Sequence, residues 1–116
     1  MHAGVAEVRA RVVAACERAG RAPGDVTIIG VTKYVDVAAA AAVVAAGLPD
    51  LGENHAQQLR DRAADERLAG ARWHFIGPLQ TNKARYVART AIAFHALDRI
   101  EAAEALSTRR SEDDPL

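Results

Sequence analysis

The sequence predicts an α/β fold in which four strand–helix units follow one N-terminal helix. Short apolar runs alternate with segments of helical periodicity, and the connections between them are short. This alternation is typical of a parallel sheet with right-handed crossovers. Four units are half of an eight-fold barrel, which typically needs roughly 250 residues, whereas this chain has 116. The units therefore match either part of a TIM (β/α) barrel or an open parallel sheet.

Composition indicates a small soluble protein with a single core. Fifteen basic and fifteen acidic side chains cancel to a formal net charge of zero. A neutral chain gives no basis for binding nucleic acid or an anionic membrane surface. The N-terminus lacks the features of a signal peptide, and no apolar run is long enough to span a bilayer. We expect a cytoplasmic protein with no nucleic-acid and no membrane partner.

The first element is expected to be an amphipathic helix from about Ala3 to Ala19, ended by Gly20. Its apolar stripe consists of residues spaced three or four positions apart: Val5, Val8, Val12 and Cys16. A cysteine on such a stripe is interpreted as a packed core thiol. Because Cys16 is the only cysteine, an internal disulfide is impossible and a cysteine-based zinc site is not expected.

The apolar run from Val26 to Lys33 predicts a short buried strand that ends on a lysine. Side chains alternate along a strand, so Lys33 shares a face with Val31 and Tyr34 points to the other face. The carboxyl ends of parallel strands are where such folds place their chemistry. The only other lysine is Lys83, and retention of a lysine in an arginine-biased chain suggests a role that arginine cannot fill.

Two further units follow the lysine strand. Asp36 is expected to cap a helix that ends at Gly47, and Leu48–Gly52 is expected to be extended. Asn54 is then expected to cap the next helix, with Gln57 at the capping-box position three residues on.

The helix after Asn54 carries a dense run of charges from Arg60 to Arg67. Oppositely charged side chains four positions apart lie side by side on a helix surface. The run is therefore interpreted as a solvated face and not as a binding patch.

The last two strands are expected at Trp73–Ile76 and Ala91–Leu97. Asp98 and Glu101 have the spacing of a capping box, which predicts a final helix over Ile100–Arg109. A sheet of four strands leaves two edges open, so the chain is a fragment, pairs with itself or forms an open sheet. Its end just before a fifth strand favours the fragment.

Lys33 is the candidate reactive group. A lysine at a strand end can form a Schiff base with a carbonyl compound when its amine is neutral and accessible. The alternative is a lysine whose stem packs along the rim while its ammonium reaches water. Position alone favours the second interpretation.

The other candidates are polar residues near the strand ends. His74 faces away from the rings on either side of it, which makes it either a contact in the same mouth as Lys33 or a hydrogen-bonded core histidine. Glu53 and Asn54 stand where a strand meets a helix. His55 and His95 have no partner at metal-ligand spacing, so they receive no role and no metal is expected.

Three segments together resemble the pyridoxal-phosphate homeostasis protein family, also described as YggS-like or proline synthetase co-transcribed. They are Ile28–Lys33, Leu51–Asn54 and Arg72–Lys83, in this order and at family-like spacing. The third segment contains Trp-His-Phe-Ile-Gly-Pro-Leu-Gln, which is long and difficult to match by chance. The similarity runs from the first helix to the last.

This resemblance implies a fold of the alanine racemase N-terminal type, in which residues 1–116 are the N-terminal part of a barrel domain that binds pyridoxal 5′-phosphate. Lys33 occupies the position of the lysine that carries the cofactor, which reverses the interpretation from position alone. Asn54 and His74 match motif positions near the cofactor. Lys83 matches the family's motif lysine and is interpreted as a surface or helix-start residue. The family carries or regulates the vitamin B6 pool without an established catalytic turnover.

Family members continue through a second half of the barrel, which holds the cofactor phosphate. The full-length family member is expected to be monomeric, whereas a half-barrel is expected to self-associate through its open edges. Two alternatives stay open. One is a racemase-like enzyme dependent on pyridoxal phosphate, and the other is a truncated half-barrel without a function of its own.

Overall fold

The computed structural model describes residues 2–110 and 115–116. Its helices and strands are α1 (His2–Ala19), β1 (Gly30–Val31), α2 (Val37–Ala45), β2 (Asp50–Glu53), α3 (Ala56–Ala63), β3 (Arg72–Phe75), α4 (Ala84–Thr90), β4 (Ala91–Phe94) and α5 (Ile100–Arg109). Short 3₁₀ turns lie at Pro23–Asp25, Glu66–Leu68 and Thr81–Lys83. None of the described helices is long and apolar enough to cross a membrane.

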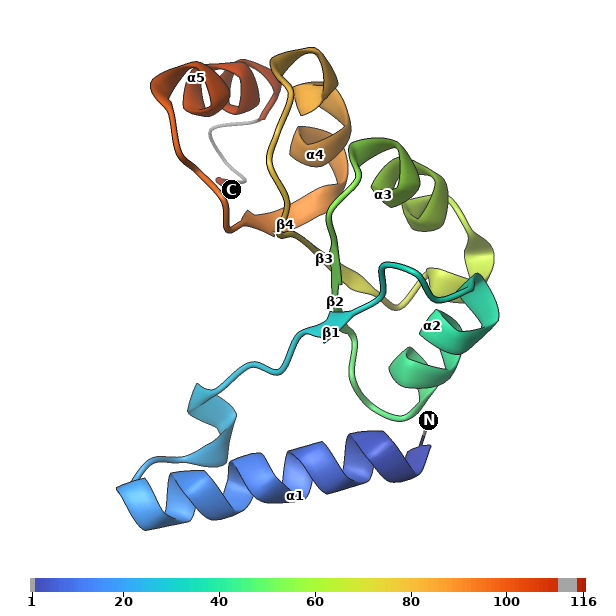
Figure 1. The fold of residues 1–116 in the computed structure, drawn as a ribbon, viewed down its shortest axis with the longest axis vertical. Helices are drawn as coiled ribbons and strands as arrows, with labels where there is room; N and C mark the ends of the chain where they lie inside the picture. The colour runs from blue at the N-terminus through green and yellow to red at the C-terminus, as the bar shows by residue number, and fades with distance from the viewer. Residues whose placement is uncertain (1, 111–114) are drawn as a thin grey trace.

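The strands form one four-stranded sheet in the order β1-β2-β3-β4, and each neighbouring pair is parallel. This confirms the predicted α/β class with a parallel sheet. Helices α2 to α5 follow one another along an arc on one side of the strands, while α1 lies beyond the β1 end (Figure 1). Because every crossover in a parallel sheet returns the chain to the same end, all four strands present their carboxyl ends at one edge.

The core lies between one face of the sheet and the arc of helices. Leu51 and Trp73 are register partners on that face, with 0% and 4% of their surface exposed. The helices contribute buried apolar side chains that pack with them: Ala40, Val43, Leu59, Val87, Ala102 and Leu106. The opposite face carries Gly52 and its register partner His74. There Val31 keeps 50% of its surface exposed, because no described helix covers that side (Figure 1).

The lysine strand is shorter than the apolar run predicts. β1 covers only Gly30 and Val31, and it pairs only with β2 within the described chain. One further ladder bond joins the backbone N–H of Thr32 to the carbonyl of Gly52 at 3.1 Å. After it the chain turns, so Lys33 lies in a turn and not at the end of an extended strand. The carbonyl of Thr32 accepts from the N–H of Val35, which closes that turn.

The first two helices end and begin as the sequence predicts. Gly20 and Gly47 take φ angles of +72° and +92°, the left-handed conformation that ends a helix. Asp36 caps α2, since its carboxylate accepts a bond of 2.7 Å from the N–H of Ala39. Cys16 is buried, with 5% of its surface exposed, which confirms the packed thiol.

Two predicted caps are wrong. The residue that precedes α3 is His55 and the one that precedes α5 is Arg99, and neither makes a side-chain capping bond. Asn54 and Asp98 each lie one residue too early to serve as caps. Spacing alone misplaced both caps because one extra extended residue separates the polar side chain from the first helical turn.

Candidate functional site

Lys33 lies on a tight turn that follows β1. The N–H of Val35 donates to the carbonyl of Thr32 at 3.3 Å, which closes the turn around Lys33 and Tyr34. Tyr34 has a φ of 69°, a conformation that costs a non-glycine residue energy, and its side chain is 89% exposed. The Lys33 ammonium lies 5.5 Å from the centre of the Tyr34 ring. The turn therefore brings Tyr34 beside Lys33, and the expectation that the two point to opposite faces is wrong.

Arg62 of α3 donates hydrogen bonds to two backbone carbonyls of this turn. Its Nη1 donates to the carbonyl of Thr32 at 3.0 Å, and its Nη2 donates to the carbonyl of Val35. Only 7% of the Arg62 surface is exposed, so the prediction that the whole charged run is solvated fails at this residue. Arg62 is three positions beyond the buried Leu59 and therefore lies on the inward face of the helix.

A fully buried carboxylate completes the support of the turn. Glu53, the last residue of β2, accepts a hydrogen bond from the Thr32 hydroxyl, and its Oε2 lies 3.7 Å from Nη1 of Arg62. The other oxygen, Oε1, is buried and has no partner within the described chain. Buried charges persist in proteins when they are paired and hydrogen-bonded. Thr32, Glu53 and Arg62, which we call the turn clamp, thus fix the backbone on both sides of Lys33.

Asn54 follows β2 at the same edge of the sheet and is half-buried. Its Oδ1 is buried and has no hydrogen-bond partner within the described chain. Gly77 approaches it closely from the loop after β3, since a Cβ there would stand 2.6 Å from the backbone oxygen of Asn54. Asn54 therefore holds an unused acceptor that a donor group of a ligand can satisfy.

A pocket of about 450 Å³ opens beside Asn54, between the loop after β2 and the loop after β3. Phe75, Pro78 and Leu79 supply apolar lining, and Lys83 contributes its side chain. Lys83 directly precedes α4, which confirms that it is a helix-start residue.

His74 lies within β3, deeper than the strand ends, and 6% of its surface is exposed. Both ring nitrogens are used inside the chain. Nε2 lies 2.9 Å from Oδ1 of Asp50, and Nδ1 lies 3.0 Å from Nε2 of His95. His74 is a hydrogen-bonded histidine of the sheet, and its partner His95 is a residue to which the sequence assigned no role. The one signal in the sequence that could have suggested the pair is that His74 and His95 lie in or directly after two consecutive strands.

Lys33 and Asn54 thus follow two neighbouring strands at the carboxyl edge of the sheet, while His74 lies within β3. No carboxylate of the described residues forms an ion pair with Lys33. Lys33 is therefore a primary amine without an acidic partner, and Asn54 holds a buried amide oxygen without a donor among the described residues. Within the described chain, no group of three or more acidic, histidine or cysteine side chains could hold a metal ion.

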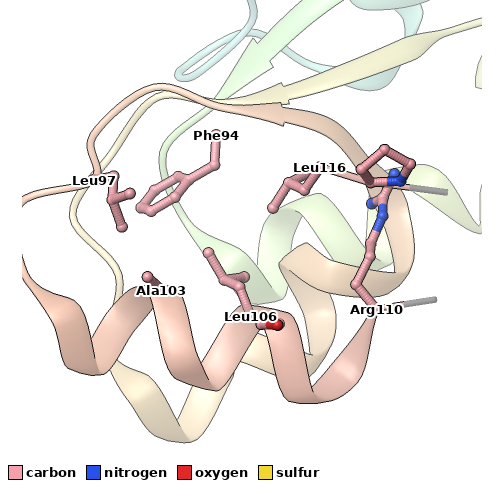
Figure 2. Close-up of a pocket in the computed structure, with 8 residues that line it drawn as sticks. Phe94, Leu97, Ala103, Leu106, Arg110 and Leu116 are labelled. Atoms are coloured by element: carbon pink, nitrogen blue, oxygen red, sulfur yellow. The ribbon is translucent and has the colours of Figure 1, made fainter. Parts of the chain in front are cut away.

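A second pocket, of about 500 Å³, lies between β4 and α5. Figure 2 shows Phe94 and Leu97 facing Ala103 and Leu106 across it, with Arg110 at one end. Arg110 donates to the carbonyls of Ala88 and Ala91. The lining is mostly apolar, and its one hydroxyl group, that of Ser107, has no histidine or carboxylate beside it in the lining.

Comparison with known proteins supports the sequence resemblance. No protein-family model matches the chain. The chain is 40% identical over 106 residues to a pyridoxal phosphate homeostasis protein of Pseudomonas aeruginosa, covering 91% of this chain and 46% of that protein. It is 37% identical over 114 residues to a pyridoxal phosphate homeostasis protein of Escherichia coli, covering 96% of this chain and 49% of that one.

A solved structure of a relative has a similar fold to this chain. PipY of Synechococcus elongatus, solved with pyridoxal phosphate (PLP) bound, superposes with a TM-score of 0.69 at 31% identity, covering 87% of this chain and 47% of PipY. The chain spans about half the length of the relatives it matches. In sequence and in fold, this chain is therefore a relative of the pyridoxal phosphate homeostasis proteins that corresponds to about half of their length.

Proposed function

We propose that this chain binds pyridoxal 5′-phosphate through a Schiff base on Lys33 and serves vitamin B6 homeostasis as a carrier or regulator. The observation that carries the proposal is the turn after β1, where Arg62 fixes the backbone on both sides of Lys33. A lysine on a backbone held by buried charge-assisted bonds is preorganised to meet a bound ligand. The relatives' names and the PLP bound to PipY identify the ligand class.

The cofactor supplies an aldehyde that condenses with a neutral primary amine. On the side of the protein, Lys33 supplies that amine, and Tyr34 lies beside its side chain. Asn54 offers a buried acceptor to a donor group of the cofactor. His74 has both ring nitrogens engaged and therefore supports the site through its neighbours and not by direct proton transfer.

We further propose that residues 1–116 form the N-terminal part of a barrel domain of the alanine racemase N-terminal type. Four parallel strands in sequential order, with helices along one side, are the arrangement that half of an eight-fold barrel would have. Phosphate sites of such barrels lie after the seventh and eighth strands. Firm binding of the phosphate group is therefore assigned to the other half of the barrel.

The test is an absorbance titration of the purified chain with PLP, followed by borohydride reduction and peptide mapping. We expect a stoichiometric absorbance band that is lost in Lys33→Ala, kept in Lys83→Ala, and mapped to Lys33 after reduction. Lys83 is the matched control because it is the only other lysine. Label spread equally over Lys33, Lys83 and the N-terminus would overturn the proposal for this chain.

A further inference from the structure

Tyr34 combines two features that an aromatic residue seldom has. With 89% of its surface exposed, it is the most exposed of the large hydrophobic side chains in the described chain. Its φ of 69° lies in the left-handed region, which strains any residue that has a Cβ. The other described residues with a positive φ are Gly20 and Gly47. A residue needed only to turn the chain would be a glycine as well, so the tyrosine side chain requires another explanation.

The turn itself does not depend on the tyrosine ring. The N–H of Val35 donates to the carbonyl of Thr32, and φ is positive only at the third of the four residues. This is typical of a type II turn, which favours glycine or asparagine at that position. Arg62 donates to the carbonyls of Thr32 and Val35, one on each side of the strained residue. Strain that the surroundings sustain in this way clusters at binding and catalytic sites.

The ring lies where a ligand attached to Lys33 would lie. Nζ of Lys33 is 5.5 Å from the centre of the Tyr34 ring, and aromatic rings that pack together have their centres 4.5–7 Å apart. A flat ring joined to Nζ therefore begins within reach of the tyrosine. The contact between ammonium and ring is weak at an exposed site, so it does not by itself account for a strained and exposed tyrosine.

We propose that Tyr34 is a ligand-contacting residue whose ring packs against the pyridine ring of PLP held on Lys33. The inference rests on the proposed function, which attaches that ring to Nζ of Lys33. Hydrolysis of the adduct adds one water across the C=N bond, breaks that bond and returns the amine of Lys33 and the aldehyde of PLP. Packing of the two rings removes their surfaces from water and stabilises the adduct against this release.

The first test is the Kd for PLP, measured from the absorbance band of the Lys33 adduct. Tyr34→Leu removes the ring and is expected to raise the Kd about fivefold, the contribution of one aromatic pair. Tyr34→Phe keeps the ring and should stay within about twofold of the unmodified chain. Tyr86→Leu is the matched control, because Tyr86 is the only other tyrosine and lies on α4, and its Kd should not change. Equal Kd values for Tyr34→Leu and the unmodified chain would overturn the proposal.

The second test separates the ring of PLP from its aldehyde. Propanal is an aldehyde without a ring, and borohydride reduction followed by peptide mapping measures how much of it labels Lys33. We expect Tyr34→Leu to leave this label unchanged while it weakens the binding of PLP. An equal loss with both aldehydes would show that Tyr34 acts on the amine of Lys33 and not on the pyridine ring, which contradicts the proposal.

The third test uses the strain. Tyr34→Gly is expected to unfold at a higher urea concentration than the unmodified chain, because glycine takes a positive φ without strain, while its Kd for PLP rises as in Tyr34→Leu. A less stable Tyr34→Gly variant would make the ring a structural element and overturn the inference. A normal band at Lys33 with all Tyr34 variants alike would contradict this inference and leave the proposed function standing. Absence of the band from the unmodified chain would contradict the proposed function, and this inference with it.

Discussion

Arg62 donates a hydrogen bond of 3.0 Å to the carbonyl oxygen of Thr32, the residue directly before Lys33. The same guanidinium donates to Val35 on the far side of the turn and lies 3.7 Å from the buried carboxylate of Glu53. Helix α3, which follows the second strand, therefore fixes the backbone that carries the lysine after the first strand. The position of Lys33 therefore depends on contacts between the first and the second strand–helix unit.

Arg62→Met is expected to destabilise the chain by about 3 to 5 kcal/mol, the usual cost of leaving a buried charge without its partner. The partner left behind is Glu53, which is fully buried. The free energy of unfolding from urea titration, followed by circular dichroism, measures the effect. The adduct band at Lys33 should fall in parallel, because the turn loses two of its backbone bonds.

Arg60→Met is the matched control on the same helix. Arg60 pairs with Asp61 at 2.9 Å, but both side chains are largely exposed, at 46% and 67%. Exposed pairs contribute little to stability, so unfolding and the Lys33 adduct should both stay as in the unmodified chain. Equal losses in the two variants would contradict the turn clamp.

Much of the fold follows from local patterns in the sequence. Apolar runs and helix stops such as Gly20 and Gly47 predict the order of elements and the parallel sheet, because they depend on neighbouring residues alone. The exact strand ends do not. β1 stops at Val31, and the chain turns after Thr32, whose carbonyl accepts from Val35 and from Arg62; a pattern of apolar residues does not reveal such a distant partner.

The site is only partly predictable for the same reason. Lys33 and Asn54 can be found in the sequence because they stand at strand ends and in family-like motifs. Arg62 reads as one more surface charge, since its burial depends on a turn thirty residues earlier. His95 has no local signal at all, because its partner His74 lies on another strand.

Asp36→Ala is expected to cost about 1 kcal/mol of unfolding free energy, the usual contribution of a helix cap. Its carboxylate accepts from Ala39 at the start of α2, the helix that follows the Lys33 turn. Asp98→Ala is the matched control, since Asp98 has the spacing of a cap but α5 is preceded by Arg99 without a side-chain bond. Urea unfolding should separate the two variants, and equal losses would restore the capping box at Asp98.

Gly77→Ala is expected to cost about 1 to 3 kcal/mol, because the new methyl would overpack the loop after β2. Its Cβ would stand 2.6 Å from the backbone oxygen and 2.9 Å from Cα of Asn54, and backbone cannot move aside as a flexible side chain can. Gly70→Ala is the control, since its Cβ would meet only Cγ1 of Val44 at an ordinary 3.5 Å. Thermal unfolding of the two variants side by side measures the difference.

Val31→Lys is expected to reduce self-association. Val31 is half exposed on β1, an edge strand of the described sheet, and a lysine on an edge strand discourages pairing with a second chain. Sedimentation velocity over a range of concentrations should show association in the unmodified chain and less in the variant. If the unmodified chain stays monomeric at high concentration, this expectation is contradicted.

Asn54→Ala is expected to affect stability and binding in opposite directions. Oδ1 of Asn54 is buried without a partner in the described chain, and a buried acceptor left unpaired costs free energy that its removal recovers. Unfolding should therefore become no easier, while PLP binding should weaken about tenfold through the loss of one hydrogen bond. Asn82→Ala, which removes an exposed amide, should change neither quantity. Loss of stability in Asn54→Ala with unchanged PLP affinity would make Asn54 a structural residue and remove it from the site.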